Sequence, residues 1–393
     1  MARGVSTSLD TSGFVEVRGP VTARIARAVS DLPAAEWDAL TDGANPFMRH
    51  AFLSALERSS SVGGRSGWTP LPVLFDGPDG RLAAALPAYL KQHSQGEYVF
   101  DHAWADAWQR AGGAYYPKLQ IAAPFTPATG PRLLTRDAAY APALLAGAEK
   151  LCALHELSSA HATFVEPEQI PLFEAGGWLI RSDIQFHWHN RGYACFDDFL
   201  QALSSRKRKA IRKERAAAQE GVDIRAFTGA EIQPEHWEAF WQFYQDTGSR
   251  KWGRPYLTRA AFDMLGEAMG EDIVLMLAFV GDTPIAGALN FLGGEALYGR
   301  YWGCTFDKPF LHFELCYYQA IELAIERGLA RVEAGAQGPH KLARGYEPVQ
   351  TFSAHYIADP GFRAAIADFL ERERAGVAQD QLYLGERTPF RRA

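Results

Sequence analysis

The stretch that decides the fold runs from Leu297 to Ile357 and reads LYGRYWGCTFDKPFLHFELCYYQAIELAIERGLARVEAGAQGPHKLARGYEPVQTFSAHYI. Its start, Leu297–Trp302, is short and rich in aromatic residues, which is typical of a β-strand. Apolar residues then recur at three- and four-residue steps from about Phe310 to Arg327, which predicts a helix. Gly328 stands where a left-handed C-terminal cap of that helix would fall.

Two further strands are predicted at Ala330–Ala334 and Thr351–Ile357. A strand, a helix and a second strand in this order predict a right-handed parallel crossover. Crossovers of this kind bind ligands beyond the carboxyl ends of their strands. The candidates for proton transfer near these ends are Glu333, His312, His340 and Glu314, and those for substrate binding are Arg300, Trp302, Gln337, Lys341 and Arg344.

A carboxylate and two histidines at such strand ends can move protons during transfer of a group to an amine. His312 and Glu314 are also expected at the N-terminus of the predicted helix, where free backbone N–H groups favour anions. Each residue alone also fits a structural role. Their clustering after two strand ends favours a site.

Composition limits the class of protein. The chain has 393 residues and a formal net charge of −6, so two domains are expected and a generally basic nucleic-acid binder is excluded. No run of about 18 apolar residues is present, which predicts no membrane span. The N-terminus lacks a secretory pattern, and the four cysteines are scattered without a CxxC pair. We therefore expect a cytoplasmic protein without structural zinc or disulfides.

A short repeat supports two related halves. Leu82–Leu86 (LAAAL) and Ile285–Leu289 (IAGAL) each follow a turn rich in glycine, proline and aspartate. An upstream helix and an apolar strand precede each, so we favour two copies of one α/β unit. The expected parts are a loose segment 1–20, an N-terminal domain 21–190 and a C-terminal domain 191–393 that includes a helix at 197–220.

That predicted helix, Asp197–Glu220, is strongly basic. It contains the run SRKRKAIRKER, and an acidic N-cap is expected at Asp197 or Asp198. A solvated surface helix is one interpretation. A polyanionic partner such as phosphate or RNA is the other, because little in the run offsets its repulsion. The predicted phosphate-binding residues are Arg206, Arg208, Lys209, Arg212, Lys213 and Arg215.

Three other segments are candidates for ligand binding. His187 and His189 alternate on one face of the predicted strand QFHWHN, without a third ligand at metal-binding spacing, so no metal site is predicted. Lys118 and Gln120 share a strand face before a proline-bounded loop. Trp252 lies among arginines and a lysine, a setting that suits a carbohydrate, nucleobase or anion. Structural roles remain open for all three segments.

Several motifs are absent. The sequence has no GxSxG elbow, GxxxxGK[ST] loop, GxGxxG fingerprint or HExxH pair. Hydrolase, nucleoside-triphosphatase and dehydrogenase interpretations therefore lose their usual support.

Three segments resemble the FemAB-like branch of the GNAT acyltransferase superfamily: Tyr115–Leu134, the basic helix with Gly221–Val222, and Leu311–Val349. The resemblance spans about 45–357. It implies an α/β fold with two tandem GNAT-like domains, each a mixed twisted sheet flanked by helices. It also implies transfer of an acyl or aminoacyl group to an amine, with aminoacyl-tRNA as donor and a peptidoglycan precursor as acceptor.

One departure bears on the donor. GNAT enzymes that use CoA usually carry a glycine-rich turn after the fourth strand, whereas the equivalent CTFDKPFLH, Cys304–His312, has no glycine. We expect an N-acyltransferase without a bound cofactor. Its cosubstrate would be aminoacyl-tRNA or acyl-CoA, and its acceptor a small-molecule or peptide amine. The alternatives are an acyl-CoA- or carrier-dependent N-acyltransferase and an inactive module that binds peptidoglycan precursors or RNA.

Overall fold

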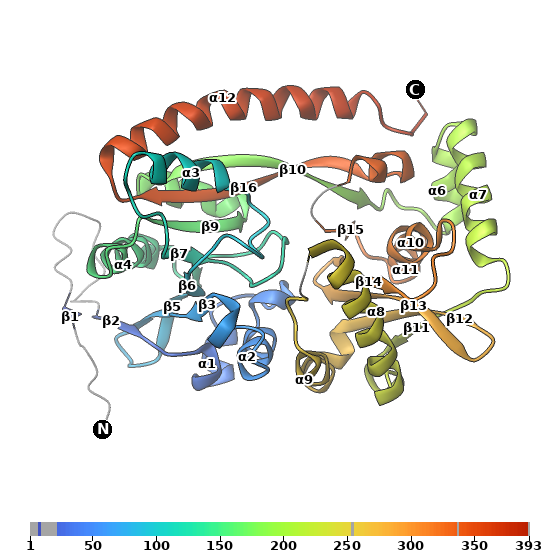
Figure 1. The fold of residues 1–393 in the computed structure, drawn as a ribbon, viewed down its shortest axis with the longest axis horizontal. Helices are drawn as coiled ribbons and strands as arrows, with labels where there is room; N and C mark the ends of the chain where they lie inside the picture. The colour runs from blue at the N-terminus through green and yellow to red at the C-terminus, as the bar shows by residue number, and fades with distance from the viewer. Residues whose placement is uncertain (1–6, 9–21, 253–254, 336–337, 392–393) are drawn as a thin grey trace. The chain divides into compact units, whose positions relative to one another are not determined.

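A computed structural model of the chain describes residues 7–8, 22–252, 255–335 and 338–391 (Figure 1). The chain forms two compact units. Unit 1 comprises Met1–Asp183 and Thr351–Val377, and unit 2 comprises Ile184–Gln350 and Ala378–Ala393. The chain therefore leaves unit 1, builds most of unit 2, and returns. This division differs from the expected one, in which every residue after 191 belonged to the C-terminal domain.

Unit 1 contains two groups of paired strands. Strands β1, β2, β4, β5 and β8 pair in that order, all antiparallel. In the other group β3, β6, β7 and β9 follow one another, and β9 also pairs with the unit 1 part of β16. These strands are β1 (Thr7–Ser8), β2 (Thr22–Ile25), β3 (Trp68–Pro70), β4 (Val73–Asp76), β5 (Leu82–Leu86), β6 (Ala88–Lys91), β7 (Lys118–Ile121), β8 (Leu134–Thr135), β9 (Ser159–Val165) and β16 (Glu347–Ile357).

Pro87 separates β5 from β6, which fits a proline's inability to donate to a strand ladder. The core of unit 1 packs α4 against β4 and β9, with Val73, Leu144 and Ala160 among its fully buried residues. The helices of unit 1 include α1 (Ala34–Asp38), α2 (His50–Arg58), α3 (His102–Arg110), α4 (Ala141–Leu154), α5 (Ile170–Ala175) and the first part of α12 (Pro360–Gly385), up to Val377.

Unit 2 is built on one mixed sheet. Its antiparallel strands β11 to β14 follow one another, β14 pairs with β15 in parallel, and β15 pairs with β10 in antiparallel fashion. The bounds are β10 (Leu179–His189), β11 (Asp223–Thr228), β12 (Ile273–Val280), β13 (Thr283–Gly293), β14 (Ala296–Cys304) and β15 (Arg331–Glu333). The predicted hairpins at β4–β5 and β12–β13 are both present.

The parallel crossover predicted from the deciding stretch is confirmed. Between β14 and β15 the chain forms α10 (Leu311–Phe313), a π-helical segment η8 (Glu314–Tyr318) and α11 (Gln319–Glu326). This helix packs its apolar side on the sheet through Leu315 and Ile321, which share a core with Leu297 and Val332. The chain leaves the helix at Gly328, whose φ of +65° is the expected left-handed cap.

The predicted basic helix is two successive helices, α6 (Phe196–Ala202) and α7 (Ser205–Gln219), both labelled in Figure 1. Leu203 interrupts them because it adopts an extended conformation, bridges Phe390 and is fully buried. The expected acidic N-cap is also wrong. Cys195 occupies that position, and the carboxylate of Asp198 accepts a hydrogen bond from the backbone of Ala194 at 3.2 Å.

The remaining helices are α8 (Pro234–Trp252), α9 (Arg259–Met269) and α12 (Pro360–Gly385), and α8 packs against β13 and β14. Among the described residues, no helix is both long enough and apolar enough to cross a membrane.

Candidate functional site

The strands β14 and β15 pair only briefly, and the site lies where their pairing ends. Ala296–Tyr298 pairs with Arg331–Glu333, and among the described residues β14 and β15 do not pair beyond Tyr298 and Glu333. On its other side β14 pairs with β13, where the register shifts so that Leu289 faces Tyr301 and Asn290 faces Gly299. Arg300 is the extra residue of this bulge. Bulges bend a strand and re-aim its side chains, and they are frequent beside active sites.

A cavity of about 130 Å³ opens at this position. Its polar and aromatic lining includes Asn290, Arg300, Trp302, His312, Cys316 and Tyr317. Typical small-molecule pockets measure roughly 300 Å³ or more, so this cavity suits the reacting end of a larger ligand. The structure thus brings together three residues predicted from sequence, namely Arg300, Trp302 and His312.

The aromatic side chains of Trp302 and Tyr317 stand beside the imidazole of His312. The ring of His312 lies 5.2 Å from that of Trp302 and 5.5 Å from that of Tyr317, in edge-on arrangements. The hydroxyl of Tyr317 is 2.9 Å from Nε2 of His340. Burial raises the pKa of Tyr317 above its usual value, so the phenol stays protonated at neutral pH. Tyr317 and His312 therefore line the same cavity, and the protonated phenol of Tyr317 is hydrogen-bonded to His340.

Glu333 lies at the end of β15 but does not line the cavity. It is 4% exposed, and its Oε1 accepts a hydrogen bond from Nε of Arg331 at 2.9 Å. Its Oε2 has no hydrogen-bond partner among the described residues and lies 3.8 Å from Nε2 of His187. Burial lowers the pKa of His187, although the Glu333 carboxylate opposes that shift. This carboxylate keeps one oxygen available as an acceptor.

The cross-strand register explains this pairing. His187 of β10 stands opposite Glu333, and His189 stands opposite Arg331. Neighbouring residues of a strand point to opposite faces. Glu333 and His187 therefore occupy the face opposite Val332, which packs in the core beside α11.

Lys341 fastens the segment that carries His340 to the end of β15. Its ammonium group donates to the carbonyl oxygens of Ala334 at 2.7 Å and Gly335 at 2.9 Å. Lys341 is 2% exposed, and burial lowers its pKa to about 8. It belongs to the 3₁₀ helix η9 (Pro339–Arg344). Arg344 completes the attachment by donating to Glu214 of α7 at 2.9 Å and to the carbonyl of His340 at 2.9 Å.

Glu314, predicted as a catalytic residue, lies in a different environment. It is fully buried and accepts hydrogen bonds from Arg215, Gln219 and Gln319 at distances of 2.8–3.2 Å. Arg215 also binds Glu322 at 2.6 Å. Arg215, predicted to bind phosphate, therefore points into unit 2 and joins α7 to the π-helical segment.

The other cations of α7 remain on the surface. Arg206, Lys209, Arg212 and Lys213 are exposed, and Arg208 is half-buried. Arg212 pairs with Asp197 at 2.6 Å. Arg208 also interacts electrostatically with Asp197. For Arg206, Lys209 and Lys213 the described part of the chain offers no acidic partner. Unpaired exposed cations along one helix remain compatible with the predicted phosphate binding.

Lys118 and Gln120 of unit 1 are fully buried. The Lys118 ammonium donates to Ser94 at 2.9 Å and to Glu97 at 2.7 Å, and it also contacts Asp101. Gln120 donates to Thr163 at 3.0 Å. Ligand binding by this pair stays a prediction.

Beyond this cluster lies a chain of buried hydrogen bonds. The hydroxyl of Tyr115 donates to Asp101 at 2.7 Å and lies 3.4 Å from Nε2 of His161. The Nδ1 atoms of His161 and His355 are 2.7 Å apart. Burial lowers the pKa of His161 to about 3 and that of His355 well below its ordinary value. Both imidazoles are therefore neutral at physiological pH.

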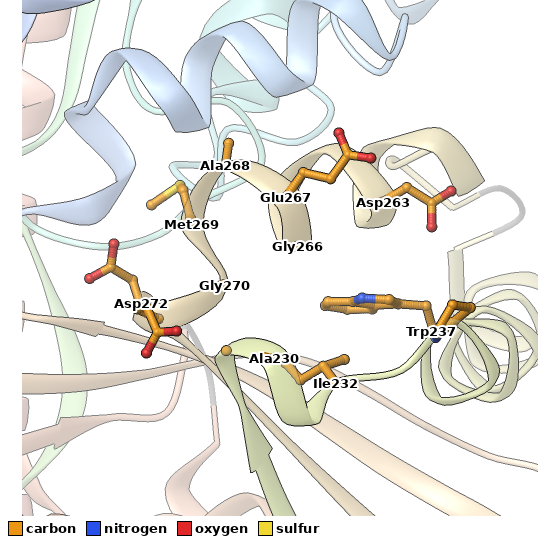
Figure 2. Close-up of a pocket in the computed structure, with 13 residues that line it drawn as sticks. Ala230, Ile232, Trp237, Asp263, Gly266, Glu267, Ala268, Met269, Gly270 and Asp272 are labelled. Carbon is orange, nitrogen blue, oxygen red and sulfur yellow. The ribbon is translucent and has the colours of Figure 1, made fainter.

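A second, larger hollow of about 560 Å³ lies elsewhere on unit 2 (Figure 2). Its lining comes from the 3₁₀ turns η6 (Gly229–Glu231) and η7 (Gly270–Asp272) and from α9, with Trp237 at one side. It contains carboxylates but no histidine and lies away from the diverging strands. We therefore place the candidate site at the smaller cavity.

Sequence reasoning missed Asn290, Cys316 and Tyr317 as lining residues. Tyr317 recurs with apolar residues at helical spacing, which indicates a core position, and only the fold shows that it lines the cavity and that its hydroxyl is hydrogen-bonded to His340. Of the other predicted residues, the side chain of Trp252 and all of Gln337 lie outside the described part of the structure. Within that part, no group of three or more histidine, cysteine, aspartate or glutamate residues could hold a metal ion.

The sequence matches a family described as peptidoglycan biosynthesis/recognition over residues 28–392. The chain belongs to the FemAB-like family. Among solved structures, this FemAB-like protein is similar to FemX, with a TM-score of 0.52 and 14% identity over 85% of this chain and 98% of FemX. A search of curated proteins gave no match.

Two further solved structures resemble this FemAB-like protein. The C-terminal domain of a putative lysylphosphatidylglycerol synthetase from Agrobacterium fabrum matches with a TM-score of 0.50 and 10% identity over 86% of this chain and 95% of that one. A tandem GNAT protein from the clavulanic acid biosynthesis pathway has a TM-score of 0.45 and 14% identity over 86% and 99%. The predicted family is confirmed. The predicted α/β class is confirmed as well, because the chain forms two units built from β-sheets flanked by helices.

Proposed function

We propose that this protein is an N-acyltransferase that moves an aminoacyl group from aminoacyl-tRNA to an amine of a peptidoglycan precursor. The observation that carries the proposal is the cavity at the diverging ends of β14 and β15, where Arg300, His312 and Tyr317 meet. Family membership supports an acceptor from peptidoglycan metabolism. The exposed cations of α7, in the same unit, support a polyanionic donor.

The cavity supplies groups for each step of acyl transfer. The acceptor nitrogen attacks the carbonyl carbon of the aminoacyl ester, a C–N bond forms, and the ester C–O bond breaks. His312 takes the proton that the amine loses, because its imidazole lines the cavity. Tyr317 donates a proton to the departing oxygen and regains one from solvent through its hydrogen-bond partner His340, and His312 releases its proton to solvent, so that all three side chains return to their starting state.

The negative charge on the tetrahedral intermediate needs donors at the same place. Arg300 and the backbone of the bulged strand around Trp302 line the cavity and can supply them. Lys341 contributes indirectly, because it holds the end of β15 and the segment bearing His340 in place. Glu333 immediately precedes Ala334, which lines the cavity, and is a second candidate base.

A transfer assay with labelled aminoacyl-tRNA and muropeptide acceptors tests the chemistry. We expect His312→Asn to lower kcat by about 100-fold or more, as for loss of a general base. Glu333→Gln tests the second candidate, and turnover at the wild-type rate in that variant would remove Glu333 from the mechanism. Turnover at the wild-type rate in His312→Asn would remove His312.

The donor is tested by titrating the protein with bulk aminoacylated tRNA and with acetyl-CoA at low and moderate salt. Replacing Arg206, Lys209 and Lys213 by Glu should weaken tRNA binding and reduce the slope of log K against log salt by about 2 to 3. The matched control is Arg110, Lys150 and Arg372 to Glu, which changes net charge equally on exposed residues of unit 1. Stoichiometric binding of acetyl-CoA without tRNA binding would overturn the proposed donor.

A further inference from the structure

The loop Thr305–Phe310, which joins β14 to α10, presents two aromatic rings to solvent. Phe306 is 57% exposed and Phe310 is 39% exposed. Single exposed apolar side chains are common on protein surfaces, but here two stand within five residues. Phe310 also has a φ of +66°, a conformation that bulky residues rarely adopt. Unfavourable backbone conformations of this kind concentrate at functional segments.

This loop is attached to both parts of the proposed site. The ammonium group of Lys308 donates to the carbonyl of Glu220 at the end of α7, at 2.9 Å. On the other side, the carbonyl of Phe310 accepts from the backbone of Glu314 at 2.9 Å. His312, which lines the cavity, follows Phe310 by two residues. The loop that carries the exposed rings is therefore bonded to the end of the basic helix and leads directly into the segment that bears His312.

The loop differs from the basic helix α7 in its net charge. Asp307 and Lys308 cancel, so the loop has no net charge with which to attract phosphates. Exposed aromatic rings instead stack on unpaired nucleobases, and such stacking tolerates any base sequence. An acyl group carried on the terminal ribose of an RNA must reach the cavity by way of its single-stranded end.

We propose that Phe306 and Phe310 stack on unpaired nucleobases at the 3′ end of the RNA donor and direct its acylated terminus to the cavity at His312. This inference rests on the proposed function, because it requires an RNA-linked donor. It assigns phosphate contacts to α7 and base stacking to the loop. The two contributions then differ in their dependence on salt.

The test uses the full-length protein and two RNA hairpins of identical stem, one blunt and one with a four-nucleotide single-stranded 3′ end. We expect the wild type to bind the hairpin with the single-stranded end more tightly. The double variant Phe306→Leu/Phe310→Leu should lose about 5- to 100-fold of that affinity, should bind the blunt hairpin as the wild type does, and should keep the salt slope. Phe100→Leu, at a ring of unit 1 that is 47% exposed, is the matched control.

Each other outcome has a distinct meaning. If the double variant weakens both hairpins equally, or neither, the stacking role is overturned while the charge reversal on α7 still tests the proposed donor separately. If the wild type binds neither hairpin at any salt concentration, both the inference and the proposed donor fail. Loss of binding to phosphatidylglycerol vesicles by the double variant, with RNA binding unchanged, would assign the loop to a lipid surface instead.

Discussion

The buried ion pair of Glu314 and Arg215 allows a prediction about stability that can be tested separately from catalysis. The carboxylate is fully buried and accepts from Arg215, Gln219 and Gln319, so these donors satisfy it in the folded state. Arg215→Met would leave that charge with only two neutral amides. Removing one partner of a buried pair costs about 3 to 5 kcal/mol. We expect Arg215→Met to lower the free energy of unfolding by about 3 kcal/mol.

Glu314→Leu should cost less than the arginine replacement. Arg215 would keep Glu322 at 2.6 Å, and Gln219 is exposed and can turn to water. A loss of about 2 kcal/mol follows from the hydrogen bonds to a charged group that disappear. The double variant should be less destabilised than the sum of the single ones, with a coupling of about 1 to 3 kcal/mol.

Urea unfolding monitored by circular dichroism gives the free energies, and amide hydrogen exchange in α7 locates the loss. The transfer assay then compares kcat with the wild type under conditions where the variants are folded. A cost below about 1 kcal/mol for Arg215→Met would refute the electrostatic reasoning. A folded Glu314→Leu protein with no turnover would show that Glu314 acts in the reaction.

Three further predictions concern other parts of the molecule. Burial holds the pKa of His161 at about 3 against an ordinary 6.5 and also lowers the pKa of its partner His355, so the unfolded chain takes up protons first as the pH falls. Each histidine should therefore contribute about 1.4 kcal/mol per pH unit to a decline of the free energy of unfolding from pH 6.5 towards pH 3, and His161→Gln should make that decline shallower. Tyr317→Phe should reduce kcat by roughly 100-fold while leaving the unfolding midpoint within a few degrees of wild type, and undiminished turnover would exclude it as the proton donor. Gly303→Ala should destabilise unit 2 by about 1 to 3 kcal/mol in urea unfolding. A Cβ at this position would lie 2.1 Å from the carbonyl oxygen of Phe243 in α8. An unchanged unfolding midpoint would contradict this packing.

Local patterns were enough to predict the crossover at 297–357. Apolar spacing, the glycine cap and the rule that ligands bind at strand ends predict Arg300, Trp302 and His312 from the sequence alone. Properties that depend on distant partners were not accessible in this way. The hydrogen bonds that satisfy the buried carboxylate of Glu314 require Arg215, which is 99 positions away in sequence.

The same limit applies to the basic helix and to the unit boundaries. Leu203 breaks the helix because it pairs with Phe390 near the end of the chain, and no local signal reports such a partner. The assignment of Thr351–Val377 to unit 1 likewise depends on the pairing of β16 with β9. Predictions from local sequence fail in this way wherever tertiary pairing overrides local propensity.

The return of the chain to unit 1 has a consequence for synthesis on the ribosome. Strand β9 obtains its partner from Phe352–Ile357, which is made only after nearly all of unit 2. At about 5 to 20 residues per second, the intervening segment takes roughly 10 to 30 s to synthesise. During that interval a growing chain presents an unpaired strand edge, which is a site for association with other chains. Truncation after Asp183 would make that exposure permanent, so fragments of unit 1 should be far less soluble than the full chain.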